Sequence, residues 1–353
     1  MLLTEIDTRR QLLNFLKCTP DFLEKMENRD YYIFEEYSEA VVSTAINIKR
    51  FHIPKKNPAL GHRTIHKPFT GNLEFCLKLL NSEISKLFVP GIAVHGFVAK
   101  RNIRSNAYSH LSRKYLLSVD IKNFFESISS PQIVESLVKI GVNRDIAESV
   151  TSVVTINGLL VQGFSTSPTL ANLVAKEFDD DIQMFVGADI TYTRYADDLY
   201  FSSDTSLPEV DKIEAILTQY GFSLNHSKTK YMPRGKAQYV TGLSVFDKAY
   251  PRIPKKIKRN VRLEIHYIKK DGFKVHIIKK HKIDEDQVPK DILDAIIEFE
   301  TYNIKQNLFG WLRFINSIEP AYAQKYLAEL SEIERANSLD KVELNEINPN
   351  ITL

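Results

Sequence analysis

Several features that define small secreted, zinc-binding or membrane proteins are scarce or absent in this chain. The 353 residues include only two cysteines, Cys18 and Cys76, and no CxxC or Cys/His cluster. This excludes a disulfide framework and a cysteine-based zinc site. No apolar run reaches the roughly 18 residues that a membrane helix needs, and the charged N-terminal segment lacks the apolar core of a signal peptide. We therefore expect a cytoplasmic protein with no membrane partner.

A strong net charge is also lacking, but the charge is unevenly distributed. The formal net charge is +3, with 43% hydrophobic and 26% charged residues, which is typical of a globular protein. Residues 252–282 contain twelve Lys or Arg against two acids, so this block carries +10 and the rest of the chain −7. A concentrated basic block favours a polyanionic partner, although a solvated basic helix has the same composition.

The hydrophobic patterns predict a mixture of helices and strands. Residues 1–48 predict two or three amphipathic helices, with apolar stripes that include Leu12, Leu13 and Leu16 and then Ala40, Val41, Ala45 and Ile46. Strands are predicted at 51–54, at 63–68 and at 115–120, where YLLSVD is a compact apolar run that ends in an acid. Residues 189–203 alternate aromatic and polar residues around Ala-Asp-Asp, which predicts a hairpin with acids at its tip.

Three aspartates in this pattern point to chemistry. Asp120 ends one predicted strand, and Asp197 and Asp198 lie at the hairpin tip. Extension of a nucleic acid chain uses two Mg²⁺ ions about 3.5–4 Å apart, one at the attacking hydroxyl and one at the leaving pyrophosphate. Mg²⁺ takes only one or two protein carboxylates per ion, so a strand end beside a hairpin tip can supply enough. Adjacent aspartates in a turn are more often simply solvated, so this pattern alone does not decide the function.

Longer motifs around these acids resemble those of reverse transcriptases. RYADDL at 194–199 resembles the YxDD box of that family, and DIKNFF at 120–125 resembles its first aspartate motif. QGFSTSP at 162–168 is similar to its glutamine-glycine loop. The resemblance implies catalysis by Asp120, Asp197 and Asp198, and a site for two Mg²⁺ ions formed by these residues and Ile121. The sequence departs from the family at Val161, where proline is usual, and at Phe164-Ser165, which replaces Ala-Pro.

The same resemblance assigns nucleotide-binding roles. Phe125 matches the aromatic residue that would exclude a 2′-hydroxyl and so favour dNTPs, Arg63 matches the arginine that clamps the triphosphate, and Lys228 matches the lysine that could protonate pyrophosphate. Lys230 is close enough in sequence to be an alternative to Lys228. Gln162 would hydrogen-bond near the incoming nucleotide or the template, and Gly163 would let the backbone approach a base pair.

Two shorter strings resemble signatures of one lineage, the bacterial retron reverse transcriptases. Residues 106–110 fit NAxxH, and residues 240–242 fit VTG. Their expected places, before the first aspartate and after the YxDD hairpin, make the pair a good discriminator. The residues to which the resemblance assigns lineage and RNA contact are Asn106, Ala107, His110, Val240, Thr241 and Gly242. Each could instead be purely structural.

The fold class that the resemblance implies is α+β, a right-hand polymerase with helical fingers, an antiparallel palm sheet and a helical thumb. The expected domains are 1–114 for the N-terminal helices and fingers, 115–250 for the palm with 131–160 returning to the fingers, 251–336 for the basic thumb, and 337–353 for a polar tail. The thumb would hold the nucleic-acid backbone without sequence specificity. Its candidate contacts are Lys255, Lys256, Lys258, Arg259 and Arg262.

The resemblance also implies partners. Retron enzymes use a structured noncoding RNA (msr-msd) as template, prime from the 2′-hydroxyl of an internal guanosine, and keep the branched RNA–DNA product (msDNA), with a separate effector protein that acts in antiphage defence. Since no RNase H region is expected, a host RNase H would trim the template. Alternatives are a group II intron or abortive-infection reverse transcriptase, and a catalytically silent RNA-binding scaffold. The intact aspartates argue against the scaffold.

Overall fold

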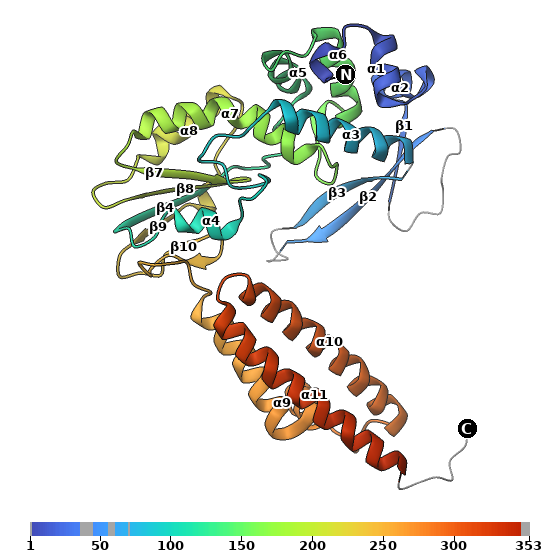
Figure 1. The fold of residues 1–353 in the computed structure, drawn as a ribbon, viewed down its shortest axis with the longest axis vertical. Helices are drawn as coiled ribbons and strands as arrows, with labels where there is room; N and C mark the ends of the chain where they lie inside the picture. The colour runs from blue at the N-terminus through green and yellow to red at the C-terminus, as the bar shows by residue number, and fades with distance from the viewer. Residues whose placement is uncertain (1, 36–44, 56–60, 70, 347–353) are drawn as a thin grey trace. The chain divides into compact units, whose positions relative to one another are not determined.

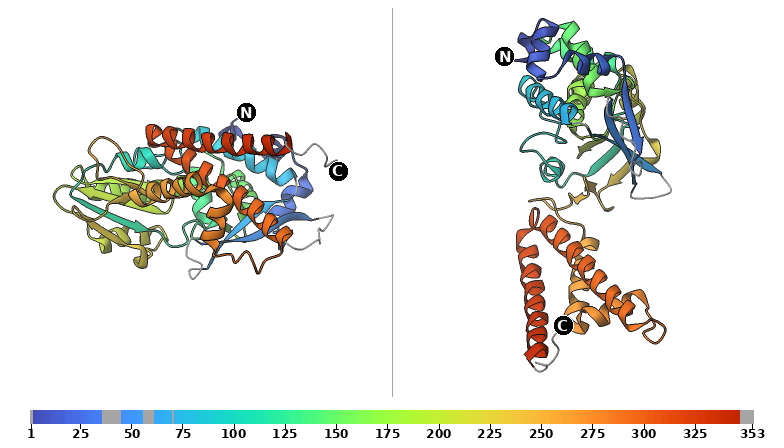
Figure 2. Two further views of the ribbon diagram at one scale, coloured as in Figure 1. Left: turned by 90° about the horizontal axis from the view of Figure 1, so that it is seen from below. Right: turned by 90° about the vertical axis from the view of Figure 1, so that its right-hand side faces the viewer.

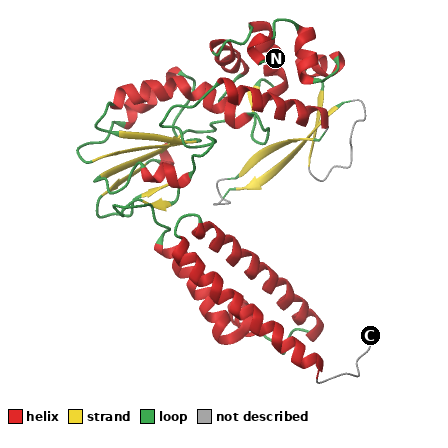
Figure 3. Ribbon diagram, viewed as in Figure 1, coloured by secondary structure: helices red, strands yellow, loops and turns green. Residues whose placement is uncertain are grey.

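The computed structural model describes residues 2–35, 45–55, 61–69 and 71–346, with side chains through residue 335. It has an α+β architecture in two compact units, Met1–Thr241 and Gly242–Leu353, and its helices and strands are distinguished in Figure 3. The second unit begins before residue 251, where the sequence predicted the start of a thumb. No described helix is both long enough and apolar enough to cross a membrane.

The first unit begins with short helices that lead into a small sheet. Thr8 and Thr19 cap the first two α-helices by accepting hydrogen bonds from backbone N–H groups of the first turn. In the sheet, β2 pairs in parallel with β1 and antiparallel with β3. The elements are η1 (Leu3–Glu5), α1 (Arg9–Leu16), α2 (Pro20–Glu27), β1 (Tyr31–Glu35), β2 (Ile46–Pro54), β3 (His62–Pro68) and α3 (Gly71–Leu87).

The prediction of two or three helices in residues 1–48 was confirmed for α1 and α2 and was wrong at β1 and at the start of β2. Residues 31–35 form β1, and Ile46 begins β2, while Ala40 and Val41 lie outside the described residues. The local sequence of β1, YYIFE, is rich in aromatic and β-branched residues that fit a pleated surface. Its pairing with β2 adds backbone hydrogen bonds that helical periodicity cannot reveal. The predicted strands at 51–54 and 63–68 fall within β2 and β3.

A four-stranded antiparallel sheet lies at one side of the first unit, away from β1–β3 (Figure 1). Its order is β7-β8-β4-β9, with β4 at Tyr115–Asp120, β7 at Thr191–Tyr195, β8 at Asp198–Ser203 and β9 at Lys230–Pro233. The strand predicted at 115–120 and the hairpin predicted within 189–203 are therefore confirmed. Because side chains alternate along a strand, Leu199 and Phe201 enter the main hydrophobic core and Asp198, Tyr200 and Ser202 face the other way.

Helices complete the first unit. Helices α7 and α8 run along one face of the sheet in Figure 1, and α7 packs on both β7 and α8. Phe178 and Ile182 on α7 are fully buried, as their four-residue spacing predicts. The elements are α4 (Ile103–Tyr108), α5 (Ser130–Lys139), α6 (Arg144–Val154), β5 (Thr155–Ile156), β6 (Leu159–Leu160), α7 (Ser167–Val186), α8 (Val210–Gln219), η3 (His226–Lys228) and β10 (Tyr239–Val240).

The second unit contains β11 (Leu243–Ser244) and three long helices, α9 (Lys255–His281), α10 (Lys290–Asn316) and α11 (Pro320–Glu346). All three helices contact one another, and they lie side by side in Figures 1 and 2. Helix α9 is kinked at Gly272, whose φ of 74° is not helical. Helix α11 continues through Glu346, so the tail expected from residue 337 is helical over its first ten residues. The remaining residues, 347–353, lie outside the description.

Candidate active site

The antiparallel pairing of β4 with β8 brings the three aspartates together. Asp120, the last residue of β4, is directly opposite Asp198, the first residue of β8. Asp197 precedes Asp198 in the two-residue turn that joins β7 to β8, and its carbonyl oxygen accepts a 2.9 Å hydrogen bond from the backbone N–H of Ile121. The adjacent turn residue, Ala196, has a left-handed φ of 57°. Asp197 and Asp198, which follow Asp120 by 77 and 78 positions in the chain, are thus held beside it at one end of the sheet.

The electrostatics of this sheet end disfavour three separate negative charges. Burial, together with the neighbouring carboxylates of Asp197 and Asp120, raises the pKa of Asp198 to about 7. Burial and Asp120 also raise the pKa of Asp197, against smaller opposing effects that include those of Lys228 and Arg63. A bound cation relieves this kind of repulsion because it stabilises the charged form of each carboxylate.

Lys228 places a cation in direct contact with this group. Its Nζ atom donates a 2.7 Å hydrogen bond to Oδ2 of Asp120. The Asp120 side chain is 7% exposed and that of Lys228 is 49% exposed, so the ammonium group reaches the buried carboxylate from the solvent side. Lys228 lies in the short helix η3, whose preceding residue, Asn225, donates its backbone N–H to the carbonyl of Asp120.

The Gln162-Gly163 loop packs directly against β3. The backbone N–H of His66 donates a 2.8 Å hydrogen bond to the carbonyl of Gln162. Gly163 has a φ of 110°, and a Cβ atom there would lie 2.3 Å from the His66 carbonyl oxygen, so only glycine fits. The Gln162 side chain donates to Glu126 at 2.9 Å. Arg63, on the same strand β3, is exposed.

Phe125 follows Asp120 closely in the chain and is only partly buried. Its ring lies 5.6 Å from that of Phe124 and 6.1 Å from that of Phe97, measured between ring centroids. Phe124 belongs to the buried core, whereas Phe97 is 49% exposed. Phe125 therefore lies at the edge of the hydrophobic core, where its ring packs against the buried ring of Phe124.

The NAxxH and VTG segments are mostly internal. The side chains of Asn106, Ala107, His110 and Val240 are fully buried, so these four side chains present no surface to RNA, and the predicted RNA contact of these segments stays a prediction. The two His110 ring nitrogens lie 2.7 Å from the hydroxyls of Ser202 and Thr193 on the sheet. A further link runs from Thr241, whose hydroxyl donates to the carbonyl of Ile103 and whose backbone N–H donates to the Tyr200 hydroxyl. Gly242, with a φ of 81°, is exposed.

The five basic residues predicted to contact nucleic acid all lie at the start of α9. Together with Tyr322 they line a pocket of about 600 Å³ in the second unit. They are not equivalent, because Lys258 is partly buried and donates to Glu319 at 2.8 and 3.1 Å. The other four are exposed: Lys255, Lys256, Arg259 and Arg262.

Comparison with known proteins identifies the family. Residues 53–274, more than half of the chain, match the family model described as "Reverse transcriptase (RNA-dependent DNA polymerase)". The chain belongs to the reverse transcriptase family. Its similarity to several curated relatives places it among the bacterial retron reverse transcriptases.

Three of these relatives illustrate the extent of the match. Retron Mx65 reverse transcriptase of Myxococcus xanthus is 34% identical over 218 residues, which cover 55% of this chain and 50% of that enzyme. Retron Ec86 reverse transcriptase of Escherichia coli is 26% identical over 81% of each chain. Retron Ec73 reverse transcriptase of Escherichia coli is 27% identical over 84% of this chain and 91% of that enzyme. The match thus spans half of the Mx65 enzyme and most of the other two.

Among solved structures, telomerase from Candida albicans superposes with a TM-score of 0.43 and 13% sequence identity. That superposition covers 88% of this chain and 56% of the telomerase chain.

Reverse transcriptases generally use divalent metal ions, and the donor set at this sheet end is of the right chemistry. Carboxylate oxygens are the hard ligands that Mg²⁺ prefers, and burial together with repulsion between the carboxylates raises the pKa values of Asp197 and Asp198, which a bound cation would oppose. Within the described ranges, however, no three His, Cys, Asp or Glu side chains are gathered as a metal site. The backbone brings the aspartates together, while the Asp120 carboxylate is engaged with Lys228.

Sequence reasoning missed a group of buried polar residues behind the hairpin. Arg194 was noted only as part of the YxDD box, yet its side chain is completely buried and paired with Asp179. The signal available in the sequence was a charged residue inside a predicted strand, directly after Tyr192 and Thr193. Asn172 and Asp179 on α7 gave no such signal, because polar residues on a long helix are usually solvated.

Proposed function

We propose that this chain is an RNA-directed DNA polymerase in which Asp120, Asp197 and Asp198 are the catalytic carboxylates. The observation that carries the proposal is the β4–β8 register, which sets Asp120 opposite Asp198 beside the turn that contains Asp197. Asp120, Asp197, Asp198 and Ile121 would hold two Mg²⁺ ions, which would neutralise charge at the attacking hydroxyl and at the leaving pyrophosphate.

In the proposed reaction, the attacking hydroxyl of the primer gives up its proton to solvent, and its oxygen forms a bond to the α-phosphorus of a dNTP. The bond from that phosphorus to the β-phosphate oxygen breaks, and pyrophosphate leaves. Lys228, whose ammonium group is held at Asp120, is placed to give a proton to the pyrophosphate. Arg63, on the strand that packs against Gly163, would bind the triphosphate.

Two features favour a template–primer and a deoxynucleotide as substrates. Phe125 is anchored by its neighbours and would clash with a 2′-hydroxyl of the incoming sugar. The exposed cations of α9 would contact phosphates of the template–primer without reading sequence. In this proposal the four-stranded sheet is the palm, the region around β1–β3 belongs to the fingers, and α9–α11 form the thumb.

The retron relatives extend the proposal to a particular RNA. We propose that the template and primer are one structured noncoding RNA, that synthesis starts from a 2′-hydroxyl of an internal guanosine, and that the branched product stays bound. A separate effector protein acting in antiphage defence and a host RNase H would complete the system. These partners follow from the lineage of the relatives and not from any contact in the chain.

The test replaces both Asp197 and Asp198 by asparagine in cells that also express the RNA encoded beside the gene. The expected result is loss of the branched DNA from cell extracts, with the RNA still copurifying with the protein. Sequencing of nucleic acid that copurifies with the unmodified protein should give one short cDNA joined to one RNA. Unchanged DNA in the double variant would contradict the proposal and favour a scaffold that only binds RNA.

A further inference from the structure

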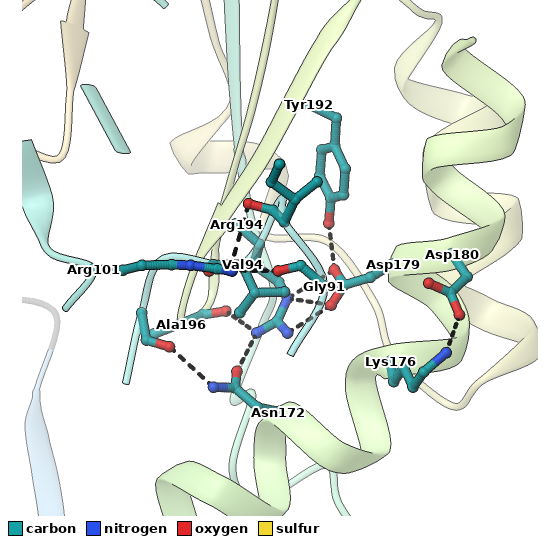
Figure 4. A network of polar contacts seen from close by, with 12 residues as sticks. Gly91, Val94, Arg101, Asn172, Lys176, Asp179, Asp180, Tyr192, Arg194 and Ala196 are labelled. Atoms are coloured by element: carbon teal, nitrogen blue, oxygen red, sulfur yellow. Dashed lines mark hydrogen bonds and ion pairs between the residues drawn. The ribbon is translucent and has the colours of Figure 1, made fainter. Parts of the chain in front are cut away.

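A buried arginine lies directly behind the turn that carries Asp197. Arg194 is on β7, two residues before Ala196, and its side chain has no solvent exposure. Its Nε donates to both carboxylate oxygens of Asp179 at 2.9 and 3.1 Å, and its Nη2 donates to Oδ2 at 2.7 Å. The Tyr192 hydroxyl donates to the same carboxylate at 2.6 Å (Figure 4). The charge of Arg194 is therefore compensated by a single acid on α7.

The remaining nitrogen of the guanidinium group faces the turn. Nη1 donates to the Oδ1 atom of Asn172 at 3.0 Å and to the carbonyl oxygen of Ala196 at 3.2 Å (Figure 4). Asn172 in turn donates from Nδ2 to the carbonyl oxygen of Gly96 at 3.0 Å. One planar group thus connects α7 to the backbone that immediately precedes Asp197.

Gly96 holds the same turn from another side. A Cβ atom at Gly96 would lie 2.4 Å from the backbone nitrogen of Ala196, so the segment before α4 touches the turn closely. The neighbouring residue, His95, donates its backbone N–H to the carbonyl of Arg194 at 2.7 Å. Ala196 itself has a left-handed φ of 57°, a conformation that a non-glycine residue keeps only when its surroundings impose it.

A buried ion pair is weak evidence for stability, because well-packed apolar residues often replace such a pair without loss. An apolar residue, however, could not donate the hydrogen bond that Nη1 of Arg194 makes to the Ala196 carbonyl oxygen. A lysine would also be a poor replacement, since its single ammonium group lacks the planar fork that spans Asp179, Asn172 and Ala196.

We infer that Arg194, held by Asp179 and Asn172, is a positioning residue that sets where the Ala196-Asp197 turn presents the carboxylates of Asp197 and Asp198. This inference rests on the proposed function, because those carboxylates are the proposed Mg²⁺ ligands. Arg194 does not touch substrate; it acts through the turn backbone.

The test compares three variants with the unmodified full chain. Arg194→Lys keeps a positive charge near Asp179 but loses the fork, and Asn172→Ala removes the link between Nη1 and Gly96. Tyr192→Phe is the matched control, because it removes one hydrogen bond to the same Asp179 carboxylate without a link to the turn. The measurements are the Mg²⁺ concentration for half-maximal dNTP incorporation, the rise in unfolding temperature caused by Mg²⁺ alone, and template–primer binding without Mg²⁺.

For Arg194→Lys and Asn172→Ala we expect the half-maximal Mg²⁺ concentration to rise about tenfold or more, with a smaller Mg²⁺-induced rise in unfolding temperature and unchanged template–primer binding. Tyr192→Phe should keep the Mg²⁺ dependence of the unmodified protein. If Arg194→Lys does not fold, the Mg²⁺ dependence of Asn172→Ala tests the inference instead. A folded variant with unchanged Mg²⁺ dependence, or an equal shift in Tyr192→Phe, overturns the inference. If the unmodified protein incorporates no dNTP, the proposed function itself fails, which is a different result.

Discussion

Lys228 donates a 2.7 Å hydrogen bond to Asp120, a residue 108 positions earlier in the chain. The pair joins the last residue of β4 to the helix η3, so the ammonium group is fixed at the proposed reaction centre. Lys230, two residues later on β9, is exposed and is the alternative that the sequence left open. Geometry therefore favours Lys228 over Lys230 for a role in proton transfer.

Replacement of Lys228 by alanine should slow dNTP incorporation by about 100-fold or more, the usual contribution of a general acid. Lys230→Ala is the matched control and should stay within a few-fold of the unmodified protein. Single-turnover incorporation at saturating dNTP measures both, with template–primer affinity measured separately. Equal losses in the two variants would show that neither lysine is specifically placed for the chemistry.

Phe125 offers a test of substrate choice. Phe125→Val should reduce the preference for dNTP over rNTP by roughly 10- to 100-fold, since a steric contact of this size is worth about 1–3 kcal/mol. Phe125→Tyr keeps the ring and should keep the preference. The ratio of kcat/KM values for dGTP and GTP on one template–primer is the measurement, and an unchanged ratio in Phe125→Val would remove Phe125 from nucleotide selection.

Local patterns in the sequence predicted the elements that carry the site. The run at 115–120 and the alternation around Ala-Asp-Asp both form strands of the four-stranded sheet, because buried strands are marked by short apolar runs and period-two alternation. The sequence alone did not predict the register that sets Asp120 opposite Asp198. A shift of one residue would have turned either side chain to the other face, so the prediction that they meet depended on family resemblance.

Other parts of the fold depended on contacts between distant residues. Strand β1 was predicted as helix, because its five residues are too few to show a clear period and its parallel pairing with β2 cannot be seen in the local sequence. Arg194 was left without a role because a charged residue is expected at the surface, and its burial is possible only through Asp179 on α7. In both cases the determining partner lies more than ten residues away.

The basic residues of α9 provide a matched pair for testing nucleic-acid binding. Arg259 is exposed, whereas the neighbouring Lys258 is bonded to Glu319. Arg259→Ala should flatten the slope of log affinity for template–primer against log salt by about 0.7–0.9, the value for one lost phosphate contact. Lys258→Ala should change the slope less, because its charge is already paired. Binding titrations between about 50 and 300 mM salt measure this slope. An unchanged slope in Arg259→Ala would contradict the proposed contact between Arg259 and a phosphate.

The burial of His110 should make the free energy of unfolding depend on pH. The ring is completely buried between Ser202 and Thr193. Burial, with smaller effects of His95 and Arg113, lowers the pKa of His110 to about 3, from an ordinary value near 6.5. The folded protein therefore keeps this imidazole neutral at pH values where the unfolded chain takes up a proton.

Because the unfolded chain takes up a proton that the folded protein does not, the folded state loses stability as the pH falls. The contribution of His110 to stability is complete above about pH 6.5 and is lost progressively as the pH falls toward 3, because protons stabilise only the unfolded state in that window. Between pH 7 and pH 5 the loss should be about 2 kcal/mol. His110→Gln retains a donor and an acceptor for the two hydroxyls but cannot titrate. Urea unfolding of the first unit at both pH values should show a pH-dependent loss about 2 kcal/mol smaller in His110→Gln, whereas equal losses would mean that His110 is protonated in the folded state.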